Sequence, residues 1–346
     1  MYFILIYLDN CSTTKLSEKV KQNIVENLDL FANPSSMYDI GINSKKIIND
    51  SRRIIADCIN CKPNEIYFTS GASESNSWAL QENFYCEDYE HHSILNNKKR
   101  VKDLLDAKIV SYMLVNNEVG FINDIKSIRK EYKNHQFHCD ATQAIGNIKV
   151  DVKDLNVDTM SFSGHKFHAP KGIGVLYIKN GIKLKPLIYG GKQEFKIRGG
   201  TENIIGISAI GVAIEESIKN LKNKQDKCKV LKNKIVENLK NYNIDYVING
   251  KNTINSILNI SIKNIESEAM LLNLYNKEIY LSGGSACNSG SLEPSETLTY
   301  LNCPKEYING VLRISLDYDN TIEEINYFCK ELNIIINRLK FLIGEY

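Results

Sequence analysis

Two side chains of complementary chemistry stand near the middle of the chain, each at the end of a strand-like run. Asp140 follows the apolar run 136–139, and Lys166 stands in Ser-Gly-His-Lys after the apolar run 157–161. A carboxylate at the end of a buried strand needs a partner, because an unpaired buried charge is costly. Pyridoxal phosphate (PLP) requires a lysine for its Schiff base and an aspartate for its pyridinium nitrogen. The pair therefore favours a PLP site as one interpretation of this stretch.

Each of these residues also has a simpler interpretation. A lone lysine is most often a solvated surface charge, and Asp140 alone is better explained as a helix N-cap, because residues 141–143 could open a helix. The segment 70–73 follows a strand and precedes a helix, so its backbone N–H groups suit a phosphate or merely begin the helix. Ser163 and His165 supply a second set of donors, which strengthens the phosphate interpretation.

Histidines give two further candidates. His135 and His138 with Asp140 resemble a metal cluster, but residues 135 and 138 point to opposite faces of a strand. No metal site is therefore predicted. His91 follows an acidic residue, and it belongs either on the face of a cofactor ring or in a surface loop.

The cysteines divide into two groups. Cys58 and Cys61 form Cys-x-x-Cys without a second pair at zinc spacing, so we interpret them as core or chance residues. Cys287 lies in the small-residue loop 282–290, where no apolar pattern would bury it. The composition of this loop is equally compatible with two interpretations of Cys287, a reactive thiol and an ordinary reduced cysteine.

Alternating elements surround these residues. Strands are expected at 2–8, 65–69, 108–115, 136–139, 157–161 and 174–178, and helices at 17–30, 41–59 and 124–132. The segment 70–74 is expected to lead into a further helix that runs to about residue 84. This alternation predicts an α/β domain with a mainly parallel sheet. After a helical stretch at 201–242, the pattern changes to that of a smaller α+β domain, with strands at 256–262, 279–282 and 311–315 and helices at 266–275 and 321–342.

Composition excludes several classes of function. The net charge of +2 over 346 residues gives no basic surface for nucleic acid or an anionic membrane. The apolar N-terminal run is too short to span a bilayer and is better explained as a buried strand. A chain of this size does not need disulfides, so its nine cysteines indicate a reduced, cytoplasmic protein.

A series of motifs, in order along nearly the whole chain, resembles the group I cysteine desulfurases. These are fold-type I PLP enzymes of the class V aminotransferase family. The motifs are Tyr-Leu-Asp at 7–9, Asn-Pro-Ser-Ser at 33–36, Phe-Thr-Ser-Gly-Ala-Ser-Glu-Ser at 68–75, Glu-His at 90–91, Val-Asn-Asn-Glu-Val-Gly at 115–120, Asp-Ala-Thr-Gln at 140–143, Ser-Phe-Ser-Gly-His-Lys at 161–166, Pro-Lys-Gly-Ile-Gly at 170–174, Arg-Gly-Gly-Thr-Glu-Asn at 198–203, Gly-Ser-Ala-Cys-Asn-Ser-Gly-Ser-Leu-Glu-Pro-Ser at 284–295 and Leu-Arg-Ile-Ser-Leu at 312–316. The cysteine motif at 284–295 is the most discriminating.

The resemblance implies a role for each matched residue. Lys166 would be the Schiff-base lysine, Asp140 the pyridinium partner and His91 the group stacked on the ring. The other cofactor contacts implied are Ala72, Ser73, Asn117, Gln143, Ser163, His165 and, from the second subunit of a homodimer, Thr201. The implied substrate-binding and sulfur-accepting residues are Asn33, Arg313 and Cys287.

The resemblance also implies the domains. A large PLP-binding domain at 15–222, with a sheet of the seven-stranded type, would accompany a small α+β domain at 1–14 and 223–346 that carries the cysteine loop. Between about 92 and 108 the chain is one strand–helix unit shorter than expected. Its C-terminus ends soon after the last helix, without the tail that often docks an iron–sulfur scaffold protein.

The implied reaction converts L-cysteine to L-alanine and leaves a persulfide on Cys287. The sulfur would pass to an acceptor protein, either an iron–sulfur scaffold or a sulfurtransferase of tRNA thiolation or thiamine synthesis. Two alternatives stay open: a selenocysteine lyase, and a degenerate paralogue that acts as an interaction or sulfur-relay protein. The shortened segment motivates the second alternative, whereas the retained Lys166, Asp140 and Cys287 oppose it.

Overall fold

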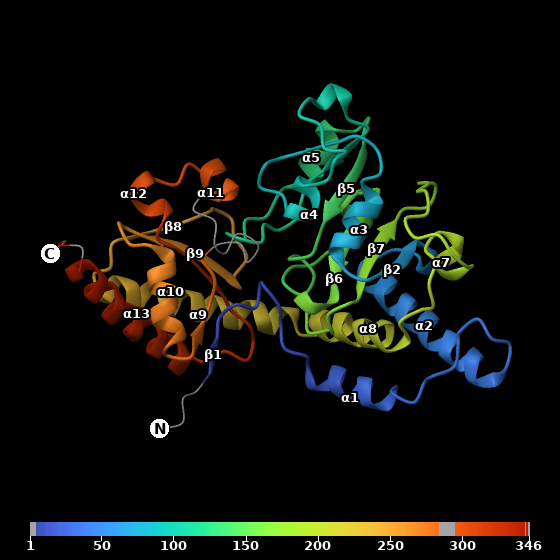
Figure 1. The fold of residues 1–346 in the computed structure, drawn as a ribbon, viewed down its shortest axis with the longest axis horizontal. Helices are drawn as coiled ribbons and strands as arrows, with labels where there is room; N and C mark the ends of the chain where they lie inside the picture. Colours follow the sequence, from blue (N-terminus) through green and yellow to red (C-terminus); the bar gives the residue numbers. More distant parts are fainter. Residues whose placement is uncertain (1–4, 284–294, 343, 345–346) are drawn as a thin grey trace. The chain divides into compact units, whose positions relative to one another are not determined.

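The computed structural model describes residues 5–283, 295–342 and 344, whose path is traced in Figure 1. The chain divides into two compact units. The first consists of Met1–Thr13, Asn116–Ile122 and Lys222–Tyr346, and the second of Thr14–Val115 and Asn123–Leu221. The segment Asn116–Ile122, which we expected in the large domain, therefore groups with the first unit.

The second unit is built on a six-stranded sheet with the order β2–β7–β6–β5–β4–β3. Its strands are β2 (Ile66–Thr69), β3 (Phe84–Cys86), β4 (Ile109–Ser111), β5 (Gln136–Asp140), β6 (Thr159–Ser163) and β7 (Gly174–Ile178). Strands β3 to β6 are parallel, whereas β7 is antiparallel to both β6 and β2. The predicted α/β class with a mainly parallel sheet is confirmed, with six strands among the described residues instead of seven.

Helices cover this sheet, and several begin where the sequence predicted. The helices are α1 (Glu18–Glu26), α2 (Asp39–Cys58), α3 (Ala72–Ala79), α4 (His92–Leu95), α5 (Ile125–Glu131), α6 (Val152–Leu155), α7 (Gln193–Lys196) and α8 (Ile204–Lys219). In Figure 1, α3 lies against the strands, and α8 packs with α1 and α2. Ser17 caps α1 by accepting the N–H of Val20. The helix expected to run to about residue 84 ends at Ala79, because Phe84 and Cys86 alternate as buried residues of β3.

The outer edge of the sheet, at β3, shows where the chain is short. The crossover from β3 to β4 contains α4 and one 3₁₀ turn (Leu104–Asp106). Phe84 donates its N–H to Lys99 O at 3.0 Å and accepts the N–H of Val101 at 2.9 Å, so Arg100 forms an isolated parallel bridge. The Arg100 side chain also pairs with Asp88. This bridge covers part of an edge that would otherwise offer unpaired backbone groups.

The first unit combines a small sheet with long helices. Its antiparallel sheet has the order β11 (Val311–Ser315), β9 (Ile257–Ile262), β8 (Tyr246–Ile248), and β1 (Ile6–Tyr7) pairs in parallel with β10 (Ile279–Tyr280). Its helices are α9 (Leu221–Asn241), α10 (Ser267–Tyr275), α11 (Glu296–Tyr300), α12 (Lys305–Ile308) and α13 (Ile322–Leu342). The expected α+β architecture is thus observed. Across the described part of the chain, we find no helix with the length and apolarity needed to cross a membrane.

Candidate active site

Asp140 ends β5 and is 5% exposed. Its Oδ1 accepts the N–H of Thr142 at 2.8 Å, and its Oδ2 accepts the amide of Asn76 at 2.8 Å. The residues after Asp140 form turns, so the helix N-cap interpretation was wrong. Ligands of open α/β sheets bind beyond the carboxyl ends of the strands, which is where this carboxylate lies.

A buried polar network extends from Asp140 into the sheet. Asn76 of α3 also donates to Ser93 Oγ at 2.9 Å, and its Oδ1 lies 3.0 Å from Nε2 of His138. The other ring nitrogen of His138 lies 2.9 Å from the hydroxyl of Thr159. Burial lowers the pKa of His138 to about 4, so its ring is neutral near pH 7. The sequence pointed to neither Asn76 nor this role of His138, although residues 138 and 140 share one face of a strand.

His91 is the N-cap residue of α4 and is half-buried, which disfavours the alternative of an exposed surface loop. Its Nδ1 accepts the backbone N–H of Ser93 at 3.1 Å and lies 2.8 Å from Ser93 Oγ. A backbone N–H can only donate, so Nδ1 is unprotonated and the neutral ring carries its proton on Nε2. Burial lowers the pKa of His91, nearby Lys166 lowers it further, and Asp140 opposes both.

Glu90 is a second buried carboxyl near Asp140. It is 4% exposed and accepts the N–H of Met113. Burial, followed by the charge of Asp140, raises its pKa well above the usual range, which favours the neutral acid. Its Oε2 and the hydroxyl of Thr142 are buried atoms without a partner among the described residues, as expected beside a site that a ligand completes.

The start of α3 forms a cradle for an anion. Ala72 and Ser73 occupy its first turn, and Gly71 before them makes no side-chain cap. A Cβ at Gly174 would lie 2.5 Å from Gly71 Cα, so only glycine permits this approach of two backbones. Ser163 borders the cradle, because its Oγ would lie 3.5 Å from a Cβ at Gly71. Backbone N–H groups at a helix N-terminus suit a phosphate.

Lys166 closes a 3₁₀ turn (Gly164–Lys166) that directly follows β6. It is close enough to His91 and His165 to lower the pKa of each. Burial has the larger effect on His165, whose pKa falls to about 4. The second unit therefore brings Lys166, Asp140 and His91 into one electrostatic neighbourhood, with the α3 cradle on the same sheet.

Arg313 organises a separate group of residues within the first unit. Its guanidinium, 2% exposed, donates through Nη2 to Asp9 at 2.8 Å and Ser12 at 2.7 Å, and through Nη1 to the carbonyl of Asn117 at 3.0 Å. Its Nε is buried and has no partner among the described residues. Ser282 donates to Asp9 at 2.8 Å. These hydrogen bonds hold the guanidinium in one orientation and leave Nε as its remaining donor.

The comparisons with known proteins agree with one another. The family model described as aminotransferase class-V matches residues 6–104 and 90–328. A cysteine desulfurase IscS of Methanosarcina thermophila is 37% identical over 377 residues, covering 97% of this chain and 93% of its own. A cysteine desulfurase IscS of Clostridium botulinum is 36% identical, with 96% and 94% covered. Among solved structures, a NifS-like protein superposes with a TM-score of 0.89 at 30% identity, covering 97% of this chain and 100% of its own. A NifS-like protein of Rickettsia africae gives 0.86 at 28%, with 96% and 100% covered.

This chain belongs to the class-V aminotransferase family, among the cysteine desulfurases. Members of this family depend on PLP, and the expected fold of type I is confirmed. The alignment with the Methanosarcina protein spans 377 residues, whereas this cysteine desulfurase chain has 346. The alignment therefore contains gaps in this chain. The two matched segments of the family model meet at 90–104, within the crossover that we expected to be short.

The remaining predicted residues of this cysteine desulfurase chain are placed as follows. Gln143 is buried in the turns after Asp140, whereas Asn33 and Thr201 are exposed. Asn33 Oδ1 accepts the N–H of Ser35 at 2.9 Å. Cys287 lies outside the described residues.

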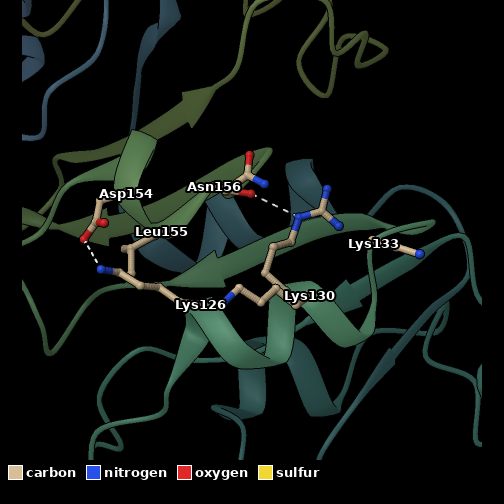
Figure 2. A pocket seen from close by; sticks show the side chains of 7 residues that line it. Lys126, Lys130, Lys133, Asp154, Leu155 and Asn156 are labelled. Atoms are coloured by element: carbon tan, nitrogen blue, oxygen red, sulfur yellow. Dashed lines mark hydrogen bonds and ion pairs between the residues drawn. The ribbon is translucent and has the colours of Figure 1, made fainter.

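A hollow of about 460 Å³ lies between α5 and α6, and its lining includes no predicted site residue. Figure 2 shows the side chains that line it. Lys126 pairs there with Asp154 at 2.6 Å, and Arg129 donates to the carbonyl of Asn156 at 3.1 Å. These bonds hold two short helices together, which explains the charged side chains in the hollow without a ligand.

Proposed function

We propose that this chain is a PLP-dependent cysteine desulfurase that uses Lys166, Asp140, His91, Arg313 and Cys287 in the roles implied by its motifs. The observation that carries the proposal is the joint placement of Lys166, Asp140 and His91 in the second unit. The names of the relatives support the same activity and do not favour the selenocysteine lyase or the degenerate paralogue.

The residues present fit PLP. The α3 cradle with Ser163 and His165 would hold the phosphate, Asp140 would face the pyridinium nitrogen, and Lys166 would form the covalent link. Gln143 and Asn117 would lie near the phenolic oxygen. When bound, PLP supplies the electron sink that makes loss of a proton from the substrate Cα possible.

The chain's own groups would then move protons and bind the substrate. Arg313 would receive the substrate carboxylate, where its unpartnered Nε offers a hydrogen bond, and Asn33 would assist. The freed amine of Lys166 would take the Cα proton. Because Nδ1 of His91 already accepts a backbone N–H, His91 acts from its neutral form as a proton donor through Nε2.

Cys287 is proposed as the nucleophile because the described cysteines are poorly suited to the role. Each of these eight cysteines is buried or half-buried. Burial raises the pKa of Cys58 to about 11 and that of Cys61 to about 12, which disfavours the thiolate. The Cys287 thiolate would attack the substrate sulfur, forming an S–S bond and breaking the C–S bond, whose electrons stay on the carbon that becomes alanine's methyl group.

We also propose a homodimer, in which Thr201 contacts the cofactor phosphate of the other subunit. Thr201 is exposed, and large apolar side chains of the second unit are exposed as well, including Phe31 at 86% and Met37 at 93%. Such side chains often mark an interface. The persulfide sulfur would pass to a protein acceptor, an iron–sulfur scaffold or a sulfurtransferase of the tRNA or thiamine pathways. Sedimentation velocity tests the dimer, and a monomer at micromolar concentration would contradict it.

The purified protein provides the test of function. With PLP and L-cysteine it should form alanine in a 1:1 ratio to sulfur released by a thiol reductant, and mass spectrometry should find 32 Da added to the peptide that contains Cys287. Cys287→Ser should retain the visible absorbance of bound PLP but pass no sulfur to an acceptor. Sulfur transfer by Cys287→Ser would show that the nucleophile is misassigned, and a wild type without bound PLP or alanine formation would overturn the function.

A further inference from the structure

Asn76 uses every hydrogen-bonding group of its side chain. It is fully buried in α3, and its amide nitrogen has two hydrogens, donated to Asp140 Oδ2 at 2.8 Å and Ser93 Oγ at 2.9 Å. Its oxygen accepts from His138 Nε2 at 3.0 Å. Because a carboxylate can only accept, the bond to Asp140 fixes which end of the amide is nitrogen.

The orientation of Asn76 is fixed from its other side as well. His138 can donate from Nε2 only if its neutral ring accepts at Nδ1, where the hydroxyl of Thr159 lies 2.9 Å away. Both His138 and Thr159 are fully buried, and they face each other on neighbouring strands β5 and β6. The donors therefore run in one direction, from Thr159 through His138 and Asn76 to Asp140.

A second branch of the network leads from Asn76 to His91. The Ser93 hydroxyl accepts the Asn76 amide, so its own hydrogen is available for Nδ1 of His91 at 2.8 Å. Asn76 thus contacts, directly or through one hydroxyl, both the carboxylate and the imidazole of the candidate active site.

We propose that Asn76 is a positioning residue of the active site, which fixes the carboxylate of Asp140 directly and the ring of His91 through Ser93. The inference rests on the proposed function, because Asp140 and His91 are the groups that would meet PLP. Asn76 itself need touch neither the cofactor nor the substrate. A purely structural role, in which Asn76 only joins α3 to the sheet, is the competing explanation.

The affinity for PLP separates the two explanations. Trp78 is the sole tryptophan of the chain, and it lies in α3 two residues after Asn76, so its quenching reports PLP binding to the apo protein. Asn76→Ala removes a hydrogen bond to a charged group and should weaken the Kd for PLP about ten- to a hundredfold. In an Asp140→Ala background the same substitution should raise the Kd by a clearly smaller factor, leaving only the part that acts through Ser93 and His91, because coupled residues are not additive. Equal losses in both backgrounds, or no loss in either, would overturn the proposal.

Matched variants control for stability. Asn249 is a buried amide of the first unit that donates to Asn259 Oδ1 at 2.7 Å and Ser261 Oγ at 2.8 Å. Asn249→Ala should lower Tm as much as Asn76→Ala does, without changing the Kd for PLP. Thr159→Val removes only the far end of the network and should weaken the Kd less than Asn76→Ala, which keeps the test available if Asn76→Ala fails to fold. A PLP affinity that follows Tm across all three variants would support the structural explanation instead.

The proposal and the function can fail separately. The double-mutant cycle compares Asn76→Ala in the wild-type and Asp140→Ala backgrounds. If the wild type binds PLP and forms alanine but this cycle shows no coupling, the proposed function stands and the role of Asn76 is overturned. A wild type that binds PLP but forms no alanine would overturn the function, whereas the cycle, which needs PLP alone, would still decide the role of Asn76. A wild type that binds no PLP would overturn both.

Discussion

The ion pair between Arg52 and Glu194 leads to a quantitative prediction for the second unit. The two guanidinium nitrogens Nη1 and Nη2 of Arg52 donate to the carboxylate of Glu194 at 2.9 and 2.6 Å. The side chains are 7% and 4% exposed, respectively. The same carboxylate accepts the N–H of Phe68 at 2.9 Å, and the guanidinium lies 4.7 Å from the centre of the Phe68 ring. The pair thereby joins α2, β2 and the segment that leads to Thr201.

Glu194→Gln should destabilise the protein strongly, because it leaves a buried guanidinium without its counter-charge. Breaking such a pair costs about 3–5 kcal/mol, whereas replacing both partners by apolar residues of similar size is often close to neutral. Arg52→Met with Glu194→Met should therefore recover much of the loss. At an exposed pair, Lys21–Glu18, the glutamate is 88% exposed. Glu18→Gln should cost at most about 1 kcal/mol.

Urea unfolding followed by Trp78 fluorescence measures these differences, since Trp78 is buried in the same unit. Glu194, Phe195 and Lys196 have positive φ angles of 41°, 55° and 73°, an uncommon conformation that the ion pair helps to maintain. A Glu194→Gln protein within about 1 kcal/mol of wild type would refute the reasoning. So would a double variant whose loss equals the sum of the two single losses, because the partners would then not interact.

Three further predictions concern the site. Arg313→Lys loses the planar guanidinium that suits a carboxylate and should lower kcat/KM for cysteine about ten- to a hundredfold. Alanine formation measures this loss, and an unchanged spectrum of bound PLP is the control. Gly174→Ala places a methyl group against the backbone of Gly71. It should lower the free energy of unfolding in urea by about 1–3 kcal/mol and weaken PLP binding. An unchanged free energy of unfolding and an unchanged PLP affinity would contradict the close approach of the two backbones. Burial and the charge of Asp140 raise the pKa of Glu90 in the folded protein, so the folded state keeps a proton that the unfolded state releases. The free energy of unfolding therefore falls as pH rises above the pKa of Glu90 in the unfolded chain. Glu90→Gln removes this dependence, so its stability relative to wild type should increase from about pH 4.5 upward, and a constant difference from pH 4 to 8 would show that Glu90 is ionised.

Local signals in the sequence were sufficient for most of the fold. The helix expected from residue 17 begins after its N-cap Ser17, and the strand–glycine–helix transition at 70–73 is observed as predicted. Both features depend only on neighbouring residues. Strand β7 has the predicted bounds. The two residues from which the chemistry was inferred, Asp140 and Lys166, lie at or just beyond the ends of adjacent parallel strands. The expected parallel sheet placed both ends at one edge, whereas the adjacency of the two strands is known only from the structure.

The groups that support the site were not predictable in the same way. Asn76, His138 and Thr159 come from α3, β5 and β6, and no local pattern states that their side chains meet. In the sequence, His138 was considered only as a metal ligand, and no metal site was predicted. The expected end of the helix near residue 84 was wrong for a related reason, because β3 is stabilised by pairing with β4 rather than by its own composition.

The short crossover explains why this network matters in this chain. His91 lies at the start of that crossover, in a segment whose helix α4 has four residues and whose outer neighbour is the single bridge at Arg100. One turn of helix is too short to hold a side chain by its own stability. The Ser93 hydroxyl joins this turn to Asn76, and α3 packs against the central strands β6 and β7. Ser93 and Asn76 therefore link His91, the candidate proton donor, to the centre of the sheet.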